Sequence, residues 1–301
     1  MSFLPDNGLA ESDLVALEYP MSELKLTAVD KVSLIAQKDF SASYFKPLRP
    51  LVIQDLAKSW PASKKWTPDF FREKHGNKRV KIYDDSFVAA GKHYMSRLKT
   101  ISMREYIDLV MTSSQDLRMF LYNIKSEIPE LVDDIIFPSL INGLSRNFVF
   151  MFFGCKGSVT QMHFDIDMSH VFHTAMYGKK TVYLFPYDQG ENLHRYPFTC
   201  RSYVDIQRPD FERFPGLKNV KGYQVLLKPG ETLYIPSGYW HHFVYNEPGY
   251  SVSLRCSNRT WPGKLRGYYN LFIMSPIDRL MNMISPQSWF DWKEQQALKT
   301  Y

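Results

Sequence analysis

A histidine and two acidic residues interrupt an otherwise apolar part of the sequence. His163, Asp165 and Asp167 form the segment "HFDID", directly after "FVFMFFGCKGSVTQM". Aspartate is depleted in strands and is rarely buried without a partner. Because residues two apart in a strand point to the same face, His163 and Asp165 would project together. A metal ion on that face would offset their burial, so the spacing predicts two ligands of a metal site, with Asp167 as the alternative carboxylate.

A third ligand is expected from a pair of histidines further along the chain. His241 and His242 lie in "PSGYWHHFVYNE", which we interpret as the end of another strand. Two imidazoles and one carboxylate on one side of a metal leave its other positions open, which is the arrangement of non-haem Fe(II) oxygenases. Either motif alone is more often structural, and their combination within one β-rich region favours a metal site. The same ligands accept Co, Ni or Zn, so the sequence leaves the metal itself open.

The region from residue 147 has the pattern of a β-sandwich or barrel. Short runs rich in β-branched and aromatic residues alternate with Gly, Pro and Asn turns. Pro229 and Gly230 predict a tight turn between two of these runs. The runs are "NFVFMFFG", "KKTVYLFP", "YQVLLKPGETLYIP", "HHFVYNE" and "YSVSLRCS". These strands would carry the candidate ligands.

The first half of the chain has the pattern of mixed helices and short strands. Leu51–Ile53 is a β-branched run, and Thr67 predicts the N-cap of a helix over Asp69–His75. Ser102 with Glu105 forms a capping-box pattern ahead of an amphipathic helix. We therefore expect an N-terminal arm, an α/β part that packs on the core, a β-barrel core and a C-terminal helical segment. Their expected boundaries are 1–45, 46–146, 147–260 and 261–301.

The C-terminal segment carries more apolar surface than a terminal helix usually needs. Such a segment packs either on the barrel or against a second copy of the chain. We expect a homodimer interface, with a cover over one end of the barrel as the alternative. The apolar residues are Leu271, Phe272, Met274, Leu280, Met281, Met283, Trp289, Phe290 and Trp292.

Composition indicates a globular protein with a weak preference for anionic partners. The chain has 301 residues, of which 45% are hydrophobic, enough for a sizeable core. Lysine and arginine number 37 against 31 acidic residues, a net charge of +6. This excess is spread along the chain, so it is weak evidence for nucleic acid.

Cysteine use and hydropathy predict a cytoplasmic protein without a membrane anchor. Cys155, Cys200 and Cys256 are odd in number and widely spaced, which argues against a disulfide scaffold. The first twenty residues lack the basic and apolar regions of a signal peptide. We find no apolar run long enough for a membrane span.

Several motifs together resemble a known family. "GSVTQMHFDID", "YGKKTVYLFP", "VDIQRPDFERFP", "KPGETLYIPSGYWHHF" and "YSVSLRCSN" are similar to the Jumonji C (JmjC) group of cupin oxygenases over roughly residues 45–260. The subgroup with the most similar motifs contains the asparaginyl hydroxylase called factor inhibiting HIF and the tRNA wybutosine hydroxylase. The resemblance implies a double-stranded β-helix, or jelly-roll, core with an N-terminal α/β extension and C-terminal helices. It also implies Fe(II), 2-oxoglutarate and O₂ as cofactors, with His163, Asp165 and His241 as the iron ligands.

The resemblance further implies residues that bind 2-oxoglutarate. In this family a lysine on the strand after the HxD motif pairs with the distal carboxylate, and Lys180 occupies that position. Strand alternation predicts that Lys179 faces outward. Thr160 and Tyr122 match positions whose hydroxyl groups bind the same carboxylate in the relatives.

Two departures from the family pattern leave alternatives open. The segment "IDMSHVFHTAMY" is slightly longer than in the asparaginyl hydroxylase, so either His170 or His173 could flank the co-substrate. The relatives carry an asparagine on the last core strand where this chain has Arg255. Arg255 and Ser257 fit the Arg-x-Ser pattern that binds 2-oxoglutarate in other oxygenases, and arginine offers two parallel donors. We favour Lys180 as the main partner of the distal carboxylate and keep Arg255 as its rival or assistant.

The expected function is hydroxylation of a C–H bond in a protein or peptide side chain, coupled to decarboxylation of 2-oxoglutarate to succinate. The alternatives are a tRNA nucleoside hydroxylase of the wybutosine type and a non-catalytic metal-binding cupin. A histone demethylase is disfavoured, because we see no zinc module or reader domain. Tyr234, Tyr239 and Trp240 are candidate walls of the substrate cavity or plain core residues.

Overall fold

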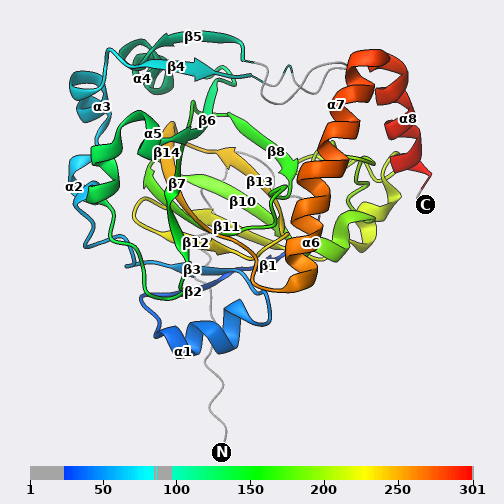
Figure 1. The fold of residues 1–301 in the computed structure, drawn as a ribbon, viewed down its shortest axis with the longest axis horizontal. Coiled ribbons are helices and arrows are strands. Elements are labelled where there is room, and N and C mark those ends of the chain that lie inside the picture. The colour runs from blue at the N-terminus through cyan, green and yellow to red at the C-terminus, as the bar shows by residue number, and fades with distance from the viewer. Residues whose placement is uncertain (1–23, 85, 87–96, 300–301) are drawn as a thin grey trace, which may run out of the picture.

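The computed structural model describes residues 24–84, 86 and 97–299. The chain from Leu144 to Cys256 forms eight consecutive strands. They lie at the centre of the molecule (Figure 1). Each of the β-rich runs noted above coincides with one or two of these strands, so the expected strands are confirmed. They are β7 (Leu144–Gly154), β8 (Val159–His163), β9 (His170–Tyr177), β10 (Lys180–Phe185), β11 (Tyr223–Leu227), β12 (Thr232–Ile235), β13 (Trp240–Tyr245) and β14 (Gly249–Cys256).

The eight strands are shared between two sheets in the order of a jelly roll. One sheet contains β11-β10-β13-β8 and the other contains β12-β9-β14-β7, with every neighbouring pair antiparallel. Most sheet neighbours are distant in sequence, because the chain crosses repeatedly between the two sheets. The fold is therefore mostly β with a jelly-roll core and flanking helices, as predicted.

Two glycine turns connect successive core strands. Gly230, between β11 and β12, has a φ of 87°, and the N–H of Glu231 donates to the carbonyl oxygen of Lys228 at 3.0 Å. Gly178, between β9 and β10, has a φ of 70°, and a Cβ there would lie 2.2 Å from the carbonyl oxygen of Pro248. Glycine adopts this left-handed conformation without steric cost. The predicted Pro-Gly turn is confirmed, and the second turn sets the start of β10.

Strands from the N-terminal part extend both core sheets. β3 (Leu51–Ile53) is fully buried and pairs with β12, while β6 (Arg118–Asn123) pairs with β7 at the other edge. β2 (Asp30–Val32) lies parallel to β3, and β1 (Thr27–Ala28) lies parallel to β11. A separate two-stranded sheet consists of β4 (Arg79–Ile82) and β5 (Lys99–Ser102).

Both predicted helix starts in the N-terminal part are confirmed. Thr67 Oγ1 accepts a backbone N–H at 3.1 Å at the start of α3 (Pro68–Lys74). Ser102 and Glu105 form a reciprocal capping box at the start of α4 (Met103–Thr112). The other helices here are α1 (Gln37–Phe40), the π-helix η2 (Ser41–Phe45), α2 (Pro61–Lys65), α5 (Ile124–Glu127) and the 3₁₀-helix η4 (Pro129–Asp134).

The long connection between β10 and β11 covers part of the sheet that contains β13. It includes the short 3₁₀-helices η5 (Tyr187–Gly190) and η6 (Pro215–Asn219). Its apolar side chains, among them Leu193, Ile206 and Phe214, belong to the same buried cluster as Trp240 of β13. This packing removes the outer face of β13 from water.

The C-terminal helices run along one side of the barrel (Figure 1). They are α6 (Trp261–Tyr269), the π-helix η7 (Asn270–Met274), α7 (Ser275–Ile284) and α8 (Pro286–Leu298). Trp289 of α8 packs on Phe198 with ring centroids 5.5 Å apart, so the segment does contact the body of the protein. A face of α6, η7 and α7 nevertheless remains exposed and apolar. It contains Trp261, Leu265, Tyr268, Tyr269, Phe272, Leu280, Met283 and Ile284. Among the described residues, no helix has the length and apolar character needed to cross a membrane.

Candidate metal centre and its cavity

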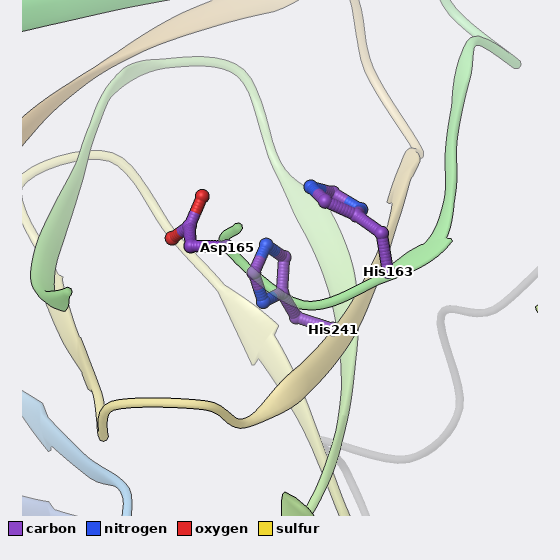
Figure 2. Close-up of side chains that lie close together, drawn as sticks. All are labelled: His163, Asp165 and His241. Atoms are coloured by element: carbon purple, nitrogen blue, oxygen red, sulfur yellow. The ribbon is translucent and has the colours of Figure 1, made fainter. Parts of the chain in front are cut away.

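Strand pairing brings the two candidate histidine ligands together. β8 and β13 are antiparallel, and His163 lies directly opposite His241 in their register. The two imidazole rings are 4.2 Å apart between centroids. With Asp165 they offer ligand atoms that all lie within 4.8 Å of one another. Figure 2 shows the three side chains converging on one space.

The structure corrects how these side chains are presented. β8 ends at His163, so Asp165 lies in the turn that follows and not on the same strand face. His241 is the second residue of β13 and so lies near the start of a strand, not at its end. The prediction that Asp165 shares a strand face with His163 is therefore wrong, because a turn and not pleating directs its carboxylate. That turn is closed by the N–H of Met168, which donates to the carbonyl oxygen of Asp165 at 2.9 Å.

Backbone contacts orient both imidazoles toward the shared space. Nδ1 of His163 is 2.7 Å from the carbonyl oxygen of Gln161, and Nδ1 of His241 is 3.0 Å from that of Tyr239. A carbonyl can only accept, so each Nδ1 carries the proton and each Nε2 keeps a free lone pair. Burial lowers the pKa of both imidazoles, which are therefore neutral at pH 7. Metal-binding histidines typically donate their other ring N–H to a carbonyl or carboxylate in this way.

Arg255 holds the carboxylate of Asp165. Its Nη2 donates to Oδ1 of Asp165 at 2.9 Å, and its Nη1 lies 3.6 Å from Oδ1 of Asp167. Burial alone would raise the pKa of Asp165, but the charge and hydrogen bond of Arg255 act against it, and the pKa is lowered. Asp165 is thus ionised and has Oδ2 left for a metal. Asp167 instead accepts hydrogen bonds from Ser169 and is not part of the three-residue cluster.

A cavity of about 480 Å³ opens from the three candidate ligands. Lys180 at the start of β10 lines it and is 1% exposed. The Nζ of Lys180 has no hydrogen-bond partner among the residues that the structure describes, and it lies 4.1 Å from the ring centroid of Tyr245. Burial lowers the pKa of Lys180 well below its usual value. An unpaired buried ammonium is costly, and an anion in this cavity would offset that cost.

Comparison with known proteins fits this geometry. The family model of the cupin-like domain matches residues 37–256. The chain belongs to the cupin-like domain family. The expected membership of the JmjC group of cupins is confirmed by this match together with the relatives' names.

Three curated relatives of this cupin-like chain illustrate two kinds of name. Lysine-specific demethylase 8 of Xenopus tropicalis is 26% identical over 238 residues, which is 75% of this chain and 52% of that protein. Lysine-specific demethylase JMJ30 of Arabidopsis thaliana is 28% identical over 264 residues, which is 83% of this chain and 60% of that protein. The tRNA wybutosine-synthesizing protein 5 of Gallus gallus is 23% identical over 256 residues, which is 78% of this chain and 79% of that protein. This chain therefore spans about half to three-fifths of the two demethylases.

The expected polar residues of the cupin-like cavity separate into those that line it and those that do not. Thr160, Lys180 and Arg255 line it, as does Ser257. Lys179 points outward and forms an ion pair with Glu247 at 2.9 Å, as strand alternation predicted. Among the residues that the structure describes, Lys180 has no carboxylate partner, whereas Arg255 has both Asp165 and Asp167.

Strand alternation also separates the two histidines of β9. His173 lines the cavity, and its Nδ1 contacts Ser253 Oγ at 2.8 Å. His170 faces the other way, where its Nδ1 contacts the hydroxyl of Tyr234 at 2.9 Å. His173 is therefore the one of the two that can reach a ligand.

Several expected site residues lie outside the cupin-like cavity. Tyr122 does not line it, because its ring packs in a buried cluster on the far side of β6, opposite Met151. Tyr234, Tyr239 and Trp240 also pack in buried clusters and are core residues, not cavity walls. His242 follows His241 on the opposite face of β13, so alternation excludes it from the metal cluster.

Sequence reasoning missed most of the apolar wall of the cavity. Phe148, Phe150 and Phe152 occupy alternate positions of β7 and all line the cavity. The period-of-two pattern in "NFVFMFF" was visible, but it did not say which face points inward. Other lining residues come from distant segments and had no local signal. Among them are Arg118, Phe120, Leu121, Cys200, Arg201 and Leu271.

Proposed function

We propose that this cupin-like protein is an Fe(II)- and 2-oxoglutarate-dependent oxygenase that hydroxylates a C–H bond of a protein or peptide side chain. The observation that supports it is one cavity with two neutral imidazoles, an ionised carboxylate and the unpaired Nζ of Lys180. A site for a metal alone would not need the buried ammonium. An anionic co-substrate beside the metal accounts for both the cluster of metal ligands and the buried ammonium.

Each residue has a distinct part in this proposal. His163 and His241 bind the metal through Nε2, because their Nδ1 atoms donate to carbonyl groups. Asp165 binds through the carboxylate oxygen that Arg255 leaves free. Lys180 neutralises the distal carboxylate of 2-oxoglutarate. Three protein ligands would leave room on the metal for the co-substrate and O₂.

The apolar wall would position the substrate and exclude water. When bound, Fe(II) with 2-oxoglutarate and O₂ supplies the oxidising power to insert one oxygen atom into a C–H bond, with release of succinate and CO₂. Phe150 and Phe152 are half-buried in the cavity wall, whereas Phe148 is 57% exposed. This gradient gives an apolar path from the surface to the metal ligands, which limits side reactions with water.

Two alternatives to a peptide hydroxylase have specific support. The relative named tRNA wybutosine-synthesizing protein 5 matches over most of its own length, and the net charge of +6 suits a nucleic acid. The relatives named lysine-specific demethylases indicate that the hydroxylated carbon could be an N-methyl group. Hydroxylation of such a carbon would release formaldehyde, so the product distinguishes this case.

The test is conversion of 2-oxoglutarate to succinate by protein loaded anaerobically with Fe(II) and then exposed to O₂. A cell extract depleted of small molecules supplies substrate. We expect turnover in the wild type and in Lys179→Ala, whose exposed lysine is the matched control. Turnover should be lost in His163→Ala and Lys180→Ala. Tight Fe(II) binding without 2-oxoglutarate binding would contradict the proposal and favour the non-catalytic cupin.

Fractionating the extract then identifies the substrate class. Stimulation that survives ribonuclease and is lost with protease indicates a protein, and the reverse result indicates tRNA. Formaldehyde in proportion to succinate indicates an N-methyl substrate. Each outcome selects one of the three candidate substrates.

We further propose that the exposed apolar face of α6, η7 and α7 forms a homodimer interface. Exposed apolar residues gathered on one helical segment are typical of an association surface. Its residues include Leu280 and Ile284, which are 55% and 68% exposed. Leu280→Glu with Ile284→Glu should convert a dimer to a monomer in sedimentation velocity. A wild type that sediments as a monomer would contradict the interface.

A cytoplasmic location is part of the same proposal. All three cysteines are free, which is typical of a reducing compartment. Fractionation of cells that express the protein tests this, and recovery with secreted or organellar fractions would contradict it.

A further inference from the structure

The ring of His173 is fixed in the wall of the cavity. His173 in β9 lies directly opposite Ser253 in β14, and its Nδ1 is 2.8 Å from the Oγ of Ser253. The ring also packs on Phe243 and Phe152, with centroid distances of 4.8 and 5.7 Å. These contacts leave the imidazole one orientation, in which Nε2 faces away from Ser253.

Nε2 of His173 is buried and has no hydrogen-bond partner among the described residues. Both His173 and Lys180 line the cavity, and the Nζ of Lys180 also lacks a partner. Leaving a buried polar atom unpaired lowers stability, so native proteins rarely do so without a functional reason. Two such nitrogen atoms in one cavity indicate a ligand that brings acceptor oxygens.

The hydrogen bond between Ser253 and Nδ1 determines whether Nε2 of His173 carries a proton. A serine hydroxyl can donate to Nδ1 of a neutral imidazole, and the ring proton then resides on Nε2. Burial, and next the neighbouring Lys180, lower the pKa of His173 well below its usual value, so the ring is neutral. In this tautomer Nε2–H is a donor. The ammonium of Lys180 balances the charge of one carboxylate, and the neutral imidazole adds a second donor without a second charge.

We propose that His173 is a second hydrogen-bond donor to the carboxylate of 2-oxoglutarate that Lys180 neutralises, and that Ser253 holds its ring in the Nε2–H tautomer. The inference rests on the proposed function and assigns a binding role to two residues of this chain. Arg255 is not needed at this carboxylate, since Asp165 and Asp167 already engage it.

Two substitutions of His173 isolate the nitrogen in question. Asparagine places its amide near the position of Nδ1, which keeps the contact with Ser253 and removes the nitrogen that faces the cavity. Glutamine reaches the position of Nε2 and can still donate there. We expect His173→Asn to bind 2-oxoglutarate about tenfold to a hundredfold more weakly than wild type, and His173→Gln within about fivefold of it. Ser253→Ala should give an intermediate loss.

The measurement is calorimetric titration of 2-oxoglutarate into Fe(II)-loaded protein without O₂. Fe(II) affinity is measured for every variant and should not change. His170→Asn is the matched control, because His170 lies on the same strand but faces away from the cavity and should keep wild-type affinity. Lys180→Ala should lose binding.

A second measurement uses the wild-type protein, so it does not require any variant to fold. In wild-type protein loaded with diamagnetic Zn(II), the ¹⁵N shifts of His173 should report protonation at Nε2 once 2-oxoglutarate is bound. A proton on Nδ1 in that complex would overturn the inference. So would His173→Asn with wild-type affinity while Lys180→Ala has lost it, and that result would leave the oxygenase proposal standing. A wild type that binds Fe(II) but not 2-oxoglutarate would overturn both.

Discussion

Asn270 of the C-terminal segment donates from Nδ2 to the carbonyl oxygen of Ile166 at 3.1 Å. Ile166 lies next to Asp165, so the helices hold the turn that presents the candidate carboxylate ligand. Asn270 is 1% exposed, and a Cβ added to Gly267 would lie 2.9 Å from the carbonyl oxygen of Asp167. The helix and the turn thus approach backbone to backbone, which couples the C-terminal segment to the metal site.

We predict that Asn270→Ala weakens metal binding as well as folding. Removing the Asn270 amide leaves the carbonyl oxygen of Ile166 without this donor, and should lower the free energy of unfolding by about 1–3 kcal/mol. Gly267→Ala should cost about 1–3 kcal/mol, because the added methyl group meets backbone that cannot move aside cheaply. Urea denaturation and zinc titration measure both effects. Lys264→Ala, at an exposed position of the same helix, should change neither.

A second prediction concerns the ion pair between Arg255 and Asp165. Arg255→Met keeps much of the side-chain volume and removes the donor that fixes Oδ1 of Asp165. Metal affinity should fall by about tenfold to a hundredfold, as for other residues that orient a ligand. Arg255→Lys should recover part of it, because an ammonium restores the charge but not the paired donors. Calorimetric titration with Zn(II) measures the affinities, and equal affinity in wild type and Arg255→Met would contradict the role.

A third prediction follows from His242, whose two ring nitrogens are buried without partners among the described residues. Burial lowers its pKa from 6.5 to about 4 in the folded protein. The unfolded chain therefore takes up a proton first as the pH falls below 6.5, and stability is lost from there down to about pH 4. The loss from this one group should approach about 3 kcal/mol.

His242→Leu removes the imidazole that takes up this proton in the unfolded chain. The substitution should stabilise the metal-free protein, and more so at pH 5 than at pH 7. An apolar side chain also suits the apolar cluster on this face of the sheet better than an imidazole without partners. Urea denaturation at the two pH values gives the difference. A variant whose stability falls as steeply with acid as that of the wild type would show that His242 is not the group responsible.

A fourth prediction concerns the hairpin of α7 and α8. Asp278 accepts from Lys293 Nζ at 2.6 Å and from Trp289 Nε1 at 2.8 Å, and Lys293 is 4% exposed. Asp278→Ala leaves a buried ammonium unpaired and should destabilise the hairpin by about 3–5 kcal/mol. Hydrogen exchange should show faster exchange in α8 than in the β-core. The double variant Asp278→Leu with Lys293→Met should recover most of the loss, since replacing both charges leaves neither unpaired.

The sequence by itself determined the elements of this protein and the chemical types of its site. Alternating apolar runs and Pro-Gly turns predicted the core strands, and the caps at Thr67 and Ser102 predicted two helices, because these signals are local. The HxD motif and His241 predicted the ligand types. The outward direction of Lys179 followed from strand alternation alone.

Only the tertiary structure decided how those parts meet. Asp165 reaches the metal cluster from a turn and not from a strand, because Arg255 of the other sheet and the C-terminal helix hold it there. Tyr122 had the expected residue type, yet its strand register directs it into the core. Partners such as Arg255 are far away in sequence, and strand register in a jelly roll is set by pairing between distant strands. No local pattern carries that information, so the contacts around each ligand emerged only from the packed fold.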